Sequence, residues 1–190
     1  MLKKEIRKTY LQKRKTLSAD EVFLLSNSIF EQFLGYFNPK KGCKIHLFLS
    51  IEKFNEVDTT QFLQFCWENQ WNVYVPKMVG EDLISLQMTP DTSFEINNWG
   101  IKEPVGTIDC GIKDYDFVIT PLLYCDQNGN RVGYGKGFYD RLFLNLNKSV
   151  QKIGVNFFPP IDLVDDIYEG DISLDYLVTP TEVLSFTKPS

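Results

Sequence analysis

Short apolar runs with the composition of buried strands alternate with helix-like stretches along most of this chain. The strand-like runs are residues 44–50, 72–76, 116–120, 152–157 and 176–179. The stretches with helical spacing of apolar residues are 2–17, 19–36, 59–69 and 138–145. Residues 80–113 are less regular and suggest short strand pieces and a turn at 97–100. The alternation predicts a single α/β domain over residues 1–190, with three layers in which helices cover both faces of a mostly parallel central sheet.

A local sequence pattern predicts the boundary between the first two helices. Ser18 followed three residues later by Glu21 forms a capping box, so we expect a new helix to begin at residue 19. In the first helix, every fourth residue is apolar up to Tyr10, which predicts a buried stripe. Lys3 and Arg7 are also four residues apart and share a neighbouring face.

Histidine and cysteine are too sparse for several kinds of catalysis. The four cysteines, at 43, 66, 110 and 125, form no CxxC pair, and we expect them to be reduced thiols. The only histidine, His46, lies in an apolar run and is expected to be a hydrogen-bonded strand residue rather than a catalytic one. Mechanisms that need a Ser-His or Cys-His pair, or several histidine metal ligands, are therefore disfavoured.

Positive charge is concentrated at the start of the chain. The formal net charge is −5, whereas residues 1–18 hold seven Lys or Arg and one acid, a net +6. This asymmetry favours a local anionic ligand over a nucleic-acid surface. A solvated basic helix and a cleaved transit peptide are the alternatives. No apolar run reaches the roughly 18 residues of a membrane span, and we expect a cytoplasmic monomer with no membrane partner.

A glycine-rich loop lies between a turn at 126–130 and the helix predicted at 138–145. Gly133, Gly135 and Gly137 allow the backbone to approach a ligand closely and to direct successive N–H groups at an anion. Arg131 and Lys136 add full positive charges. The spacing matches neither a P-loop nor a dinucleotide-binding loop. The loop therefore predicts a phosphate site of another kind, with a plain structural turn as the alternative.

Asp140 lies in the first turn of the helix that follows this loop. A bare carboxylate would repel phosphate there, but a carboxylate bridged to phosphate by Mg²⁺ would help to hold it. The alternative is that Asp140 only complements the helix dipole. The sequence leaves both interpretations open.

The segment 129–141 closely resembles the signature of the 5-formyltetrahydrofolate cyclo-ligase family, also called methenyltetrahydrofolate synthetases. Weaker matches follow in the family's order over nearly the full chain, at residues 3–7, 48–50 with 56–59, 75–77, 99–104, 116–121 with 126, and 170–175. The segment between Ser50 and Glu56 is two residues longer than the family pattern, and Lys136 stands where many bacterial members have glycine.

The resemblance implies a NagB/RpiA/CoA-transferase-like fold and a specific reaction. Family members use ATP and Mg²⁺ to close the ring of 5-formyltetrahydrofolate to 5,10-methenyltetrahydrofolate, releasing ADP and phosphate. The formyl oxygen is phosphorylated to an iminium phosphate, which N10 of the folate attacks. Such phosphoryl transfer depends on positioning and charge neutralisation more than on a protein nucleophile.

The resemblance also implies roles for individual residues. The ATP-binding set would be Lys3, Arg7, Arg131, Gly133, Tyr134, Gly135, Lys136, Gly137, Phe138 and Tyr139. The folate-binding set would be Leu49, Glu56, Trp99, Tyr134, Gly135, Lys136, Gly137 and Phe138. Asp140 and Asp171 would bind magnesium. From their charge, we expect Arg131 and Lys136 to offset the negative charge that develops on the transferred phosphoryl group, and to act in catalysis together with Tyr134.

Simpler roles stay open for several of these side chains. Trp99 could be a buried turn aromatic, Glu56 a charge at a helix N-terminus, Asp175 the metal ligand in place of Asp171, and Lys3 and Arg7 plain surface charges. Lys77 could meet the folate glutamate or a phosphate. A binding protein without turnover, and a sugar-phosphate isomerase or acyl-transfer enzyme of the same fold, are the competing functions.

Overall fold

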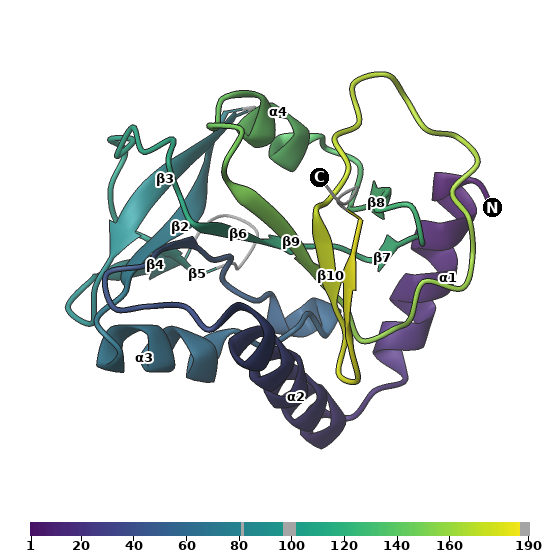
Figure 1. The fold of residues 1–190 in the computed structure, drawn as a ribbon, viewed down its shortest axis with the longest axis horizontal. Coiled ribbons are helices and arrows are strands. Elements are labelled where there is room, and N and C mark those ends of the chain that lie inside the picture. The colour runs from purple at the N-terminus through teal and green to yellow at the C-terminus, as the bar shows by residue number, and fades with distance from the viewer. Residues whose placement is uncertain (81, 97–101, 187–190) are drawn as a thin grey trace.

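A seven-stranded β-sheet forms the middle of the molecule (Figure 1). The computed structural model describes residues 1–80, 82–96 and 102–186. The strands are β1 (Lys44–His46), β2 (Asn72–Val79), β3 (Asp82–Met88), β6 (Phe117–Pro121), β9 (Gln151–Val155), β10 (Tyr176–Val178) and β11 (Val183–Ser185). Their order is β11-β10-β9-β6-β1-β2-β3, with antiparallel pairing only at the two edges, β2 with β3 and β10 with β11. The prediction of a mostly parallel sheet is confirmed.

Helices cover both faces of this sheet, as the alternating pattern predicted. α2 (Ala19–Phe37) and α3 (Thr60–Glu68) pack on one face, and α4 (Phe138–Leu144) packs on the other (Figure 1). α1 (Lys3–Lys15) lies at one end of the sheet, beside the small hairpin of β7 (Tyr124–Cys125) and β8 (Arg131–Val132). The three-layer α/β/α architecture is therefore confirmed.

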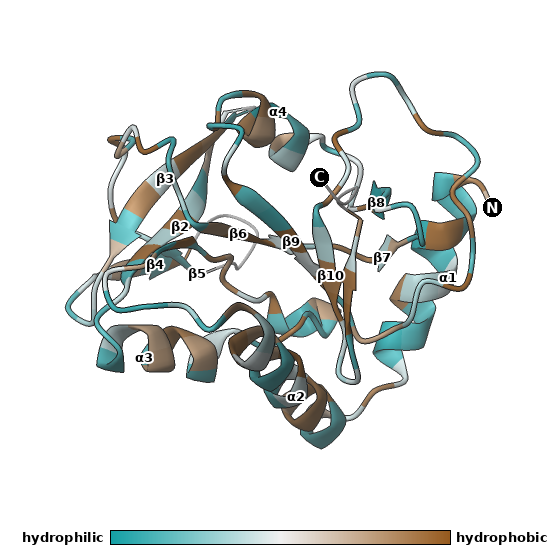
Figure 2. Ribbon diagram, in the orientation of Figure 1, coloured by the Kyte–Doolittle hydropathy of each residue, from teal (hydrophilic) through white to brown (hydrophobic). Residues whose placement is uncertain are grey.

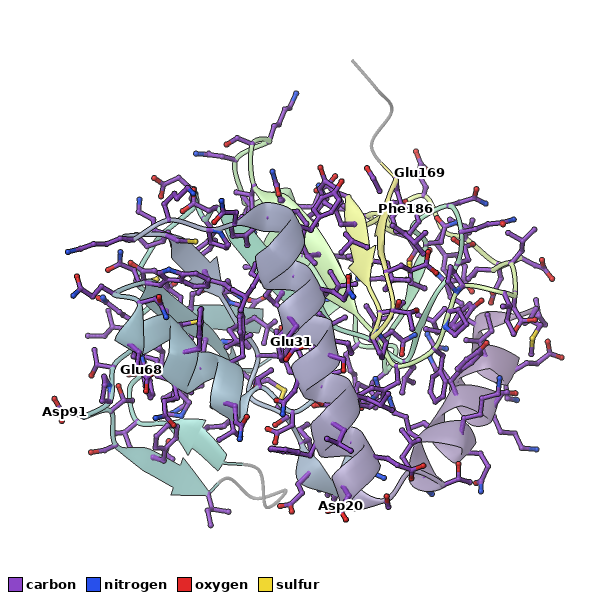
Figure 3. The ribbon with its side chains drawn as sticks, turned by 60° about the horizontal axis from the view of Figure 1, so that its bottom comes forward. Asp20, Glu31, Glu68, Asp91, Glu169 and Phe186 are labelled. Carbon is purple, nitrogen blue, oxygen red and sulfur yellow. The ribbon has the colours of Figure 1, made fainter. Side chains whose placement is uncertain are left out.

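The larger core lies between the sheet and the α2–α3 layer. Phe30 of α2 stacks on Phe62 of α3 at 4.0 Å between ring centroids, and Phe33 meets the edge of Phe62 at 5.4 Å. Alternate residues of the strands, such as Val73 and Val75 of β2, point into this cluster. Apolar residues accordingly concentrate in the central strands (Figure 2). Acidic residues such as Glu31 and Glu68 lie on the outer side of the helices (Figure 3).

The predicted helix boundaries hold to within a residue or two. Ser18 caps α2, accepting a hydrogen bond from the Glu21 amide, and the Glu21 carboxylate accepts one from the Ser18 amide at 2.7 Å. In α1, Ile6 and Tyr10 are fully buried, and the Tyr10 ring stacks on Tyr124 at 4.2 Å. The apolar stripe thus attaches α1 to the β7–β8 hairpin.

The strand predictions were less accurate in extent. The predicted strand 44–50 ends as a strand at His46, although Leu47 and Phe48 remain buried. The predicted strand 72–76 continues to Val79, through Pro76. Proline is tolerated there because β1 pairs with β2 only as far as Tyr74, which leaves β3 as the one ladder neighbour.

Short strand pieces were expected within residues 80–113, and β3 lies there together with the hairpin of β4 (Phe94–Ile96) and β5 (Lys102–Pro104). The turn expected at 97–100 lies outside the described residues. The hairpin of β7 and β8 and the edge strand β11 were not predicted. The predicted turn at 126–130 connects β7 to β8. The buried Asp126 carboxylate holds this turn by accepting hydrogen bonds from the amides of Asn128 and Asn130, both at 2.9 Å. This turn fixes where the glycine-rich loop begins.

His46 differs from its prediction in one respect. It is a buried strand residue, as expected, but neither ring nitrogen forms a hydrogen bond with any part of the chain that the structure describes. Its ring lies 5.3 Å from that of Tyr115 and 6.4 Å from that of Tyr139. Burial lowers the pKa of His46 from 6.5 to about 3, so the imidazole is neutral at ordinary pH. No helix within the described ranges is long and apolar enough to cross a membrane.

Candidate active site

The basic first helix lies directly against the glycine-rich loop. Arg7 Nε donates a hydrogen bond to the Gly133 carbonyl at 2.9 Å. The guanidinium also covers Gly135, where an added Cβ would come within 3.2 Å of Arg7 Nη2. Gly135 has φ +94°, a conformation that other residues rarely adopt. The backbone conformation therefore favours glycine at this position, and any larger residue would also displace the Arg7 guanidinium.

The backbone amides of this loop are available to a ligand. From Gly133 to Tyr139, no amide donates a hydrogen bond to any residue within the described ranges. α4 follows immediately, with Gly137 as an N-cap residue that has no capping side chain. Unpaired amides beside a cationic side chain suit an anion such as phosphate. The geometry is thus compatible with the predicted phosphate site.

Asp140 is tied to Arg131 and to the segment after β9. Arg131 Nη2 lies 2.5 Å from Asp140 Oδ1, and the Ile172 amide donates to the same oxygen at 3.0 Å. Arg131 also donates to the Ile172 carbonyl and lies over the Phe143 ring at 4.8 Å. These bonds connect β8, α4 and the segment between β9 and β10.

Asp171 is tied to the start of α1. Its Oδ2 atom forms an ion pair with Lys3 Nζ and accepts a hydrogen bond from the Tyr168 amide at 2.7 Å. The backbone amide of Lys3 donates to Asp166 Oδ1 at 2.6 Å, which also joins α1 to this acidic segment. Asp140 of α4 is bonded to Ile172, and Ile172 directly follows Asp171 in the chain. The fold therefore brings together the two carboxylates predicted for magnesium.

The two carboxylates fit a magnesium–phosphate complex better than a site made by protein alone. No cluster of three or more potential ligands occurs among the residues that are described. Within those residues, Asp140 Oδ2 and Asp171 Oδ1 accept no hydrogen bond. Asp140 Oδ2 would lie 4.0 Å from a Cβ on Gly137, so it faces the glycine loop. Mg²⁺ commonly takes one or two carboxylates together with phosphate oxygens and water.

Asp175, the alternative ligand, is engaged elsewhere. Its Oδ2 atom pairs with Lys152 Nζ at 2.7 Å and accepts the Lys152 amide at 2.8 Å. This carboxylate therefore holds β9 to the segment before β10. The geometry favours Asp171 as the second carboxylate of the site.

Glu56 lies on the other side of the loop and is only 5% exposed. Its Oε1 atom accepts a hydrogen bond from the Tyr134 hydroxyl at 2.7 Å, and Oε2 accepts one from the Ile51 amide at 2.8 Å. Burial raises the pKa of Glu56, while Tyr134, Ile51 and Arg14 partly oppose that rise. The interpretation of Glu56 as a helix N-terminal charge is not supported, since its carboxylate faces the glycine loop.

Arg14 is a site residue that the sequence reasoning missed. It is 1% exposed and lies near Glu56, with Nη1 donating to the Tyr134 hydroxyl at 3.4 Å. A signal was present, because Arg14 continues the spacing of Ile6 and Tyr10 by four more residues. An arginine in an apolar stripe is unusual unless it is paired.

The other predicted residues are less closely engaged. Leu49 is half-buried against the main core, Lys136 is exposed, and Arg141 lies over the Phe138 ring at 5.2 Å. The Tyr139 hydroxyl is buried with no hydrogen-bond partner in the described part of the chain, and burial raises the pKa of this phenol. Trp99 lies outside the described residues.

Lys77 has partners within the protein. Its Nζ atom pairs with Glu95 at 2.6 Å and donates to the Pro104 carbonyl at 2.9 Å, so it fastens the β4–β5 hairpin to β2. A role in binding folate or phosphate is therefore not needed to explain this buried lysine.

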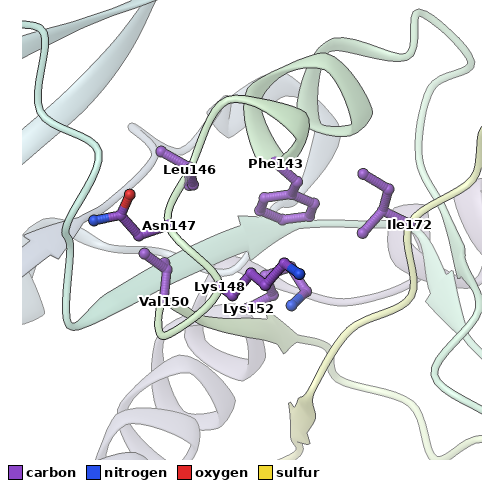
Figure 4. A pocket seen from close by; sticks show the side chains of 7 residues that line it. All are labelled: Phe143, Leu146, Asn147, Lys148, Val150, Lys152 and Ile172. Carbon is purple, nitrogen blue, oxygen red and sulfur yellow. The ribbon is translucent and has the colours of Figure 1, made fainter.

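A small cavity lies beside the C-terminal part of α4, whose Phe143 lines it (Figure 4). Its volume is about 180 Å³. Its lining residues are Phe143, Leu146, Asn147, Lys148, Val150, Lys152 and Ile172. Ile172, which lines this cavity, also donates its backbone amide hydrogen to Asp140.

The fold is that of an α/β protein with a mostly parallel sheet, and its glycine loop, basic helix and two carboxylates form a site whose chemistry suits an anionic ligand. Comparison with known proteins identifies the family. The model of the 5-formyltetrahydrofolate cyclo-ligase family matches residues 1–179. The chain belongs to this family and is a cyclo-ligase enzyme of folate metabolism.

Individual relatives agree with the family match. A 5-formyltetrahydrofolate cyclo-ligase of Mycoplasma pneumoniae is 32% identical over 181 residues, 94% of this chain and 98% of that protein. One from Haemophilus influenzae is 31% identical over 162 residues, 82% and 83% of the two chains. The solution structure of the Aquifex aeolicus 5,10-methenyltetrahydrofolate synthetase superimposes with a TM-score of 0.83 at 30% identity, covering 100% of this chain and 95% of the other.

Proposed function

We propose that this cyclo-ligase converts 5-formyltetrahydrofolate to 5,10-methenyltetrahydrofolate with ATP as co-substrate and Mg²⁺ as the metal. The observation that carries the proposal is the contact of Arg7 with Gly133 and Gly135, beside the two carboxylates Asp140 and Asp171. This arrangement supplies amides, cations and metal ligands together, which a triphosphate requires and a plain structural turn does not.

The reaction needs an activated formyl group, because a formamide carbonyl is a poor electrophile. The formyl oxygen attacks the γ-phosphorus, a new O–P bond forms, and the bond to the β-phosphate oxygen breaks to release ADP. N10 of the folate then attacks the iminium carbon and gives up its proton, and the carbon–oxygen bond breaks as phosphate leaves and carries that proton away. No histidine nucleophile or base is required, which suits a chain whose single histidine is buried and neutral.

The cations of the site have separate roles in this scheme. Arg7 contacts the loop from α1, and Lys3 of the same helix pairs with Asp171; both would bind the phosphates of ATP. Arg131 and Lys136 flank the glycines and would offset the charge on the transferred phosphoryl group. Tyr134 and the loop from Gly133 to Tyr139 would hold ATP on one side and the formyl group on the other.

Magnesium, when bound, would neutralise phosphate charge and orient the phosphoryl group. Asp140 and Asp171 would hold it through the oxygens that face away from Arg131 and Lys3. Each carboxylate is paired with a cation that is itself proposed to bind phosphate. Binding of the nucleotide would therefore shift Arg131 and Lys3 from carboxylate to phosphate.

The folate would lie on the Glu56 side of the loop. The pterin ring carries N–H groups, and an ionised Glu56 can accept hydrogen bonds from them. Leu49 and Phe138 would contact the ring system, and the proposed contact of Trp99 stays a prediction from the family resemblance.

The test mixes the protein with 5-formyltetrahydrofolate, ATP and Mg²⁺. The methenyl product absorbs in the near ultraviolet, where the substrate does not, so absorbance should rise only when all three components are present. Omission of ATP and addition of EDTA serve as controls. A folded protein that binds ATP but gives no absorbance change would support a binding protein without turnover and would overturn the proposal.

A further inference from the structure

Arg14 connects three segments that surround the proposed folate site. Its Nη2 atom donates to the Leu122 carbonyl just after β6, and Nη1 donates to the Tyr134 hydroxyl of the glycine loop. Its own carbonyl accepts a hydrogen bond from Asn55 Nδ2 at 2.9 Å, which fixes the segment carrying Glu56. Burying an arginine is costly unless it is paired. Packing alone does not account for this position.

The Tyr134 hydroxyl lies between Arg14 and Glu56. A hydroxyl that accepts from Arg14 Nη1 directs its own hydrogen to Glu56 Oε1, 2.7 Å away. The guanidinium therefore orients both the tyrosine and the carboxylate. The Tyr134 residue as a whole is 41% exposed, so this buried pair is connected directly to the open face of the loop.

The charged and titratable groups around Glu56 come from three elements. α1 contributes Arg14, the glycine loop contributes Tyr134, and α4 contributes Tyr139. Asp58, in the same segment as Glu56, is bonded to Ser50 and to the Thr60 amide instead. Within the described ranges, Arg14 is the cation that acts on Glu56.

We infer that Arg14 is a positioning residue that orients Tyr134 and, through it, the Glu56 carboxylate, so that Glu56 can accept hydrogen bonds from the N–H groups of the folate ring. This inference rests on the proposed function. Burial raises the pKa of Glu56 and Arg14 opposes that rise, so loss of Arg14 raises the pKa further. A protonated Glu56 would direct its O–H group at the N–H groups of the folate ring, and two donors cannot form a hydrogen bond with each other. Folate binding therefore falls as pH is lowered, and falls at a higher pH without Arg14.

The experiment measures binding by calorimetry, with 5-formyltetrahydrofolate and Mg·ATP titrated separately, from about pH 5.5 to about pH 8. Arg14→Met should weaken folate binding about tenfold at neutral pH, since a hydrogen bond to a charged group is lost. Binding of Mg·ATP should change by less than about threefold, because its proposed cations Lys3 and Arg7 are untouched. The acidic limb of the folate profile should move to higher pH.

Two further variants make the result specific. Arg14→Lys keeps the charge and should recover most of the folate affinity and the original pH profile. Lys15→Met removes one positive charge from the adjacent, exposed position and should leave both affinities unchanged. If Arg14→Met does not fold, Arg14→Lys compared with Arg14→Gln provides the same readout of charge.

The outcomes separate this inference from the proposed function. Unaltered protein that binds no 5-formyltetrahydrofolate would overturn both. If the unaltered protein binds folate and Arg14→Met shows the same affinity and the same pH profile, only the role of Arg14 is overturned. Equal losses of folate and ATP affinity would also overturn it, because they would indicate a purely structural residue.

Discussion

Two regions of this molecule are built from opposite kinds of side chain. The region between the sheet and the α2–α3 layer is aromatic and aliphatic, with Phe30, Phe33 and Phe62 in direct ring contact. The region where α1 meets the glycine loop holds buried or half-buried charges, among them Arg14 and Glu56. Burial of apolar surface stabilises a fold, whereas burial of charge costs free energy unless partners compensate it.

The comparison suggests a division of roles. The apolar region would supply the stability that allows the charged region to keep cations and carboxylates close together before any ligand binds. Ion pairs such as Lys3–Asp171 and Arg131–Asp140 would limit the cost of holding those charges. Four predictions test whether stability and function separate in this way.

The largest expected effect is on stability. Phe62→Ala removes a buried ring and leaves a cavity, which should lower the free energy of unfolding by about 3–5 kcal/mol. Phe23→Ala on the exposed side of α2 should change it by less than about 0.5 kcal/mol. Urea denaturation measures both. A folded Phe62→Ala protein that also loses affinity for ATP or folate would contradict the division.

His46 should make stability depend on pH. Its pKa is about 3 in the folded protein against 6.5 ordinarily, so the unfolded chain binds a proton that the folded protein excludes. The resulting stability is complete above the unfolded pKa and is lost as pH falls through the range between the two values. Between pH 6.5 and pH 4 the loss should reach about 3 kcal/mol.

Urea denaturation of the unaltered protein and of His46→Leu at about pH 7 and about pH 4 provides the measurement. The variant should lose less stability on acidification than the unaltered protein. If both proteins lost the same free energy of unfolding, His46 would not be the cause of the pH dependence, because its imidazole would accept a proton in the folded state as well.

Asp140→Asn tests the charged region. Loss of one charge-stabilising group in an active site typically lowers turnover about 100-fold, close to 3 kcal/mol. Excess Mg²⁺ should partly restore the rate, because the weakened site still has Asp171. Asp175→Asn is the matched control, since that carboxylate pairs with Lys152, and it should leave the magnesium dependence unchanged. A normal rate for Asp140→Asn would remove its role as a metal ligand.

The smallest effect is expected from the cations of α1. A Lys3→Ala, Arg7→Ala double variant should raise the KM for ATP about tenfold, which corresponds to about 1.4 kcal/mol. The matched control is Lys4→Ala with Lys8→Ala, which removes the same charge from the exposed side of the helix. Steady-state kinetics with ATP varied distinguishes the two. Equal KM values in the two double variants would mean that the charge acts only at long range.

The features that the sequence predicted well are those with a local cause. The capping box at Ser18 and Glu21 defines the start of α2 because all of its bonds lie within four residues. Helical spacing predicted α1 and α3, and the glycines at 133, 135 and 137 predicted the loop beside α4. Short strands such as β7 and β8 were missed, because a two-residue strand carries no periodic signal.

What the sequence by itself determined is the layered α/β architecture, the glycine loop and the family, since each depends on residues close together or on their order. Only the tertiary structure decided which charges meet. Lys3 and Asp171 are 168 positions apart, and Arg14 lies next to Tyr134 across 120 positions. The physical reason is that an ion pair between distant residues depends on how the helices and the sheet pack. The local sequence around a charged residue does not specify which distant segment that residue will contact.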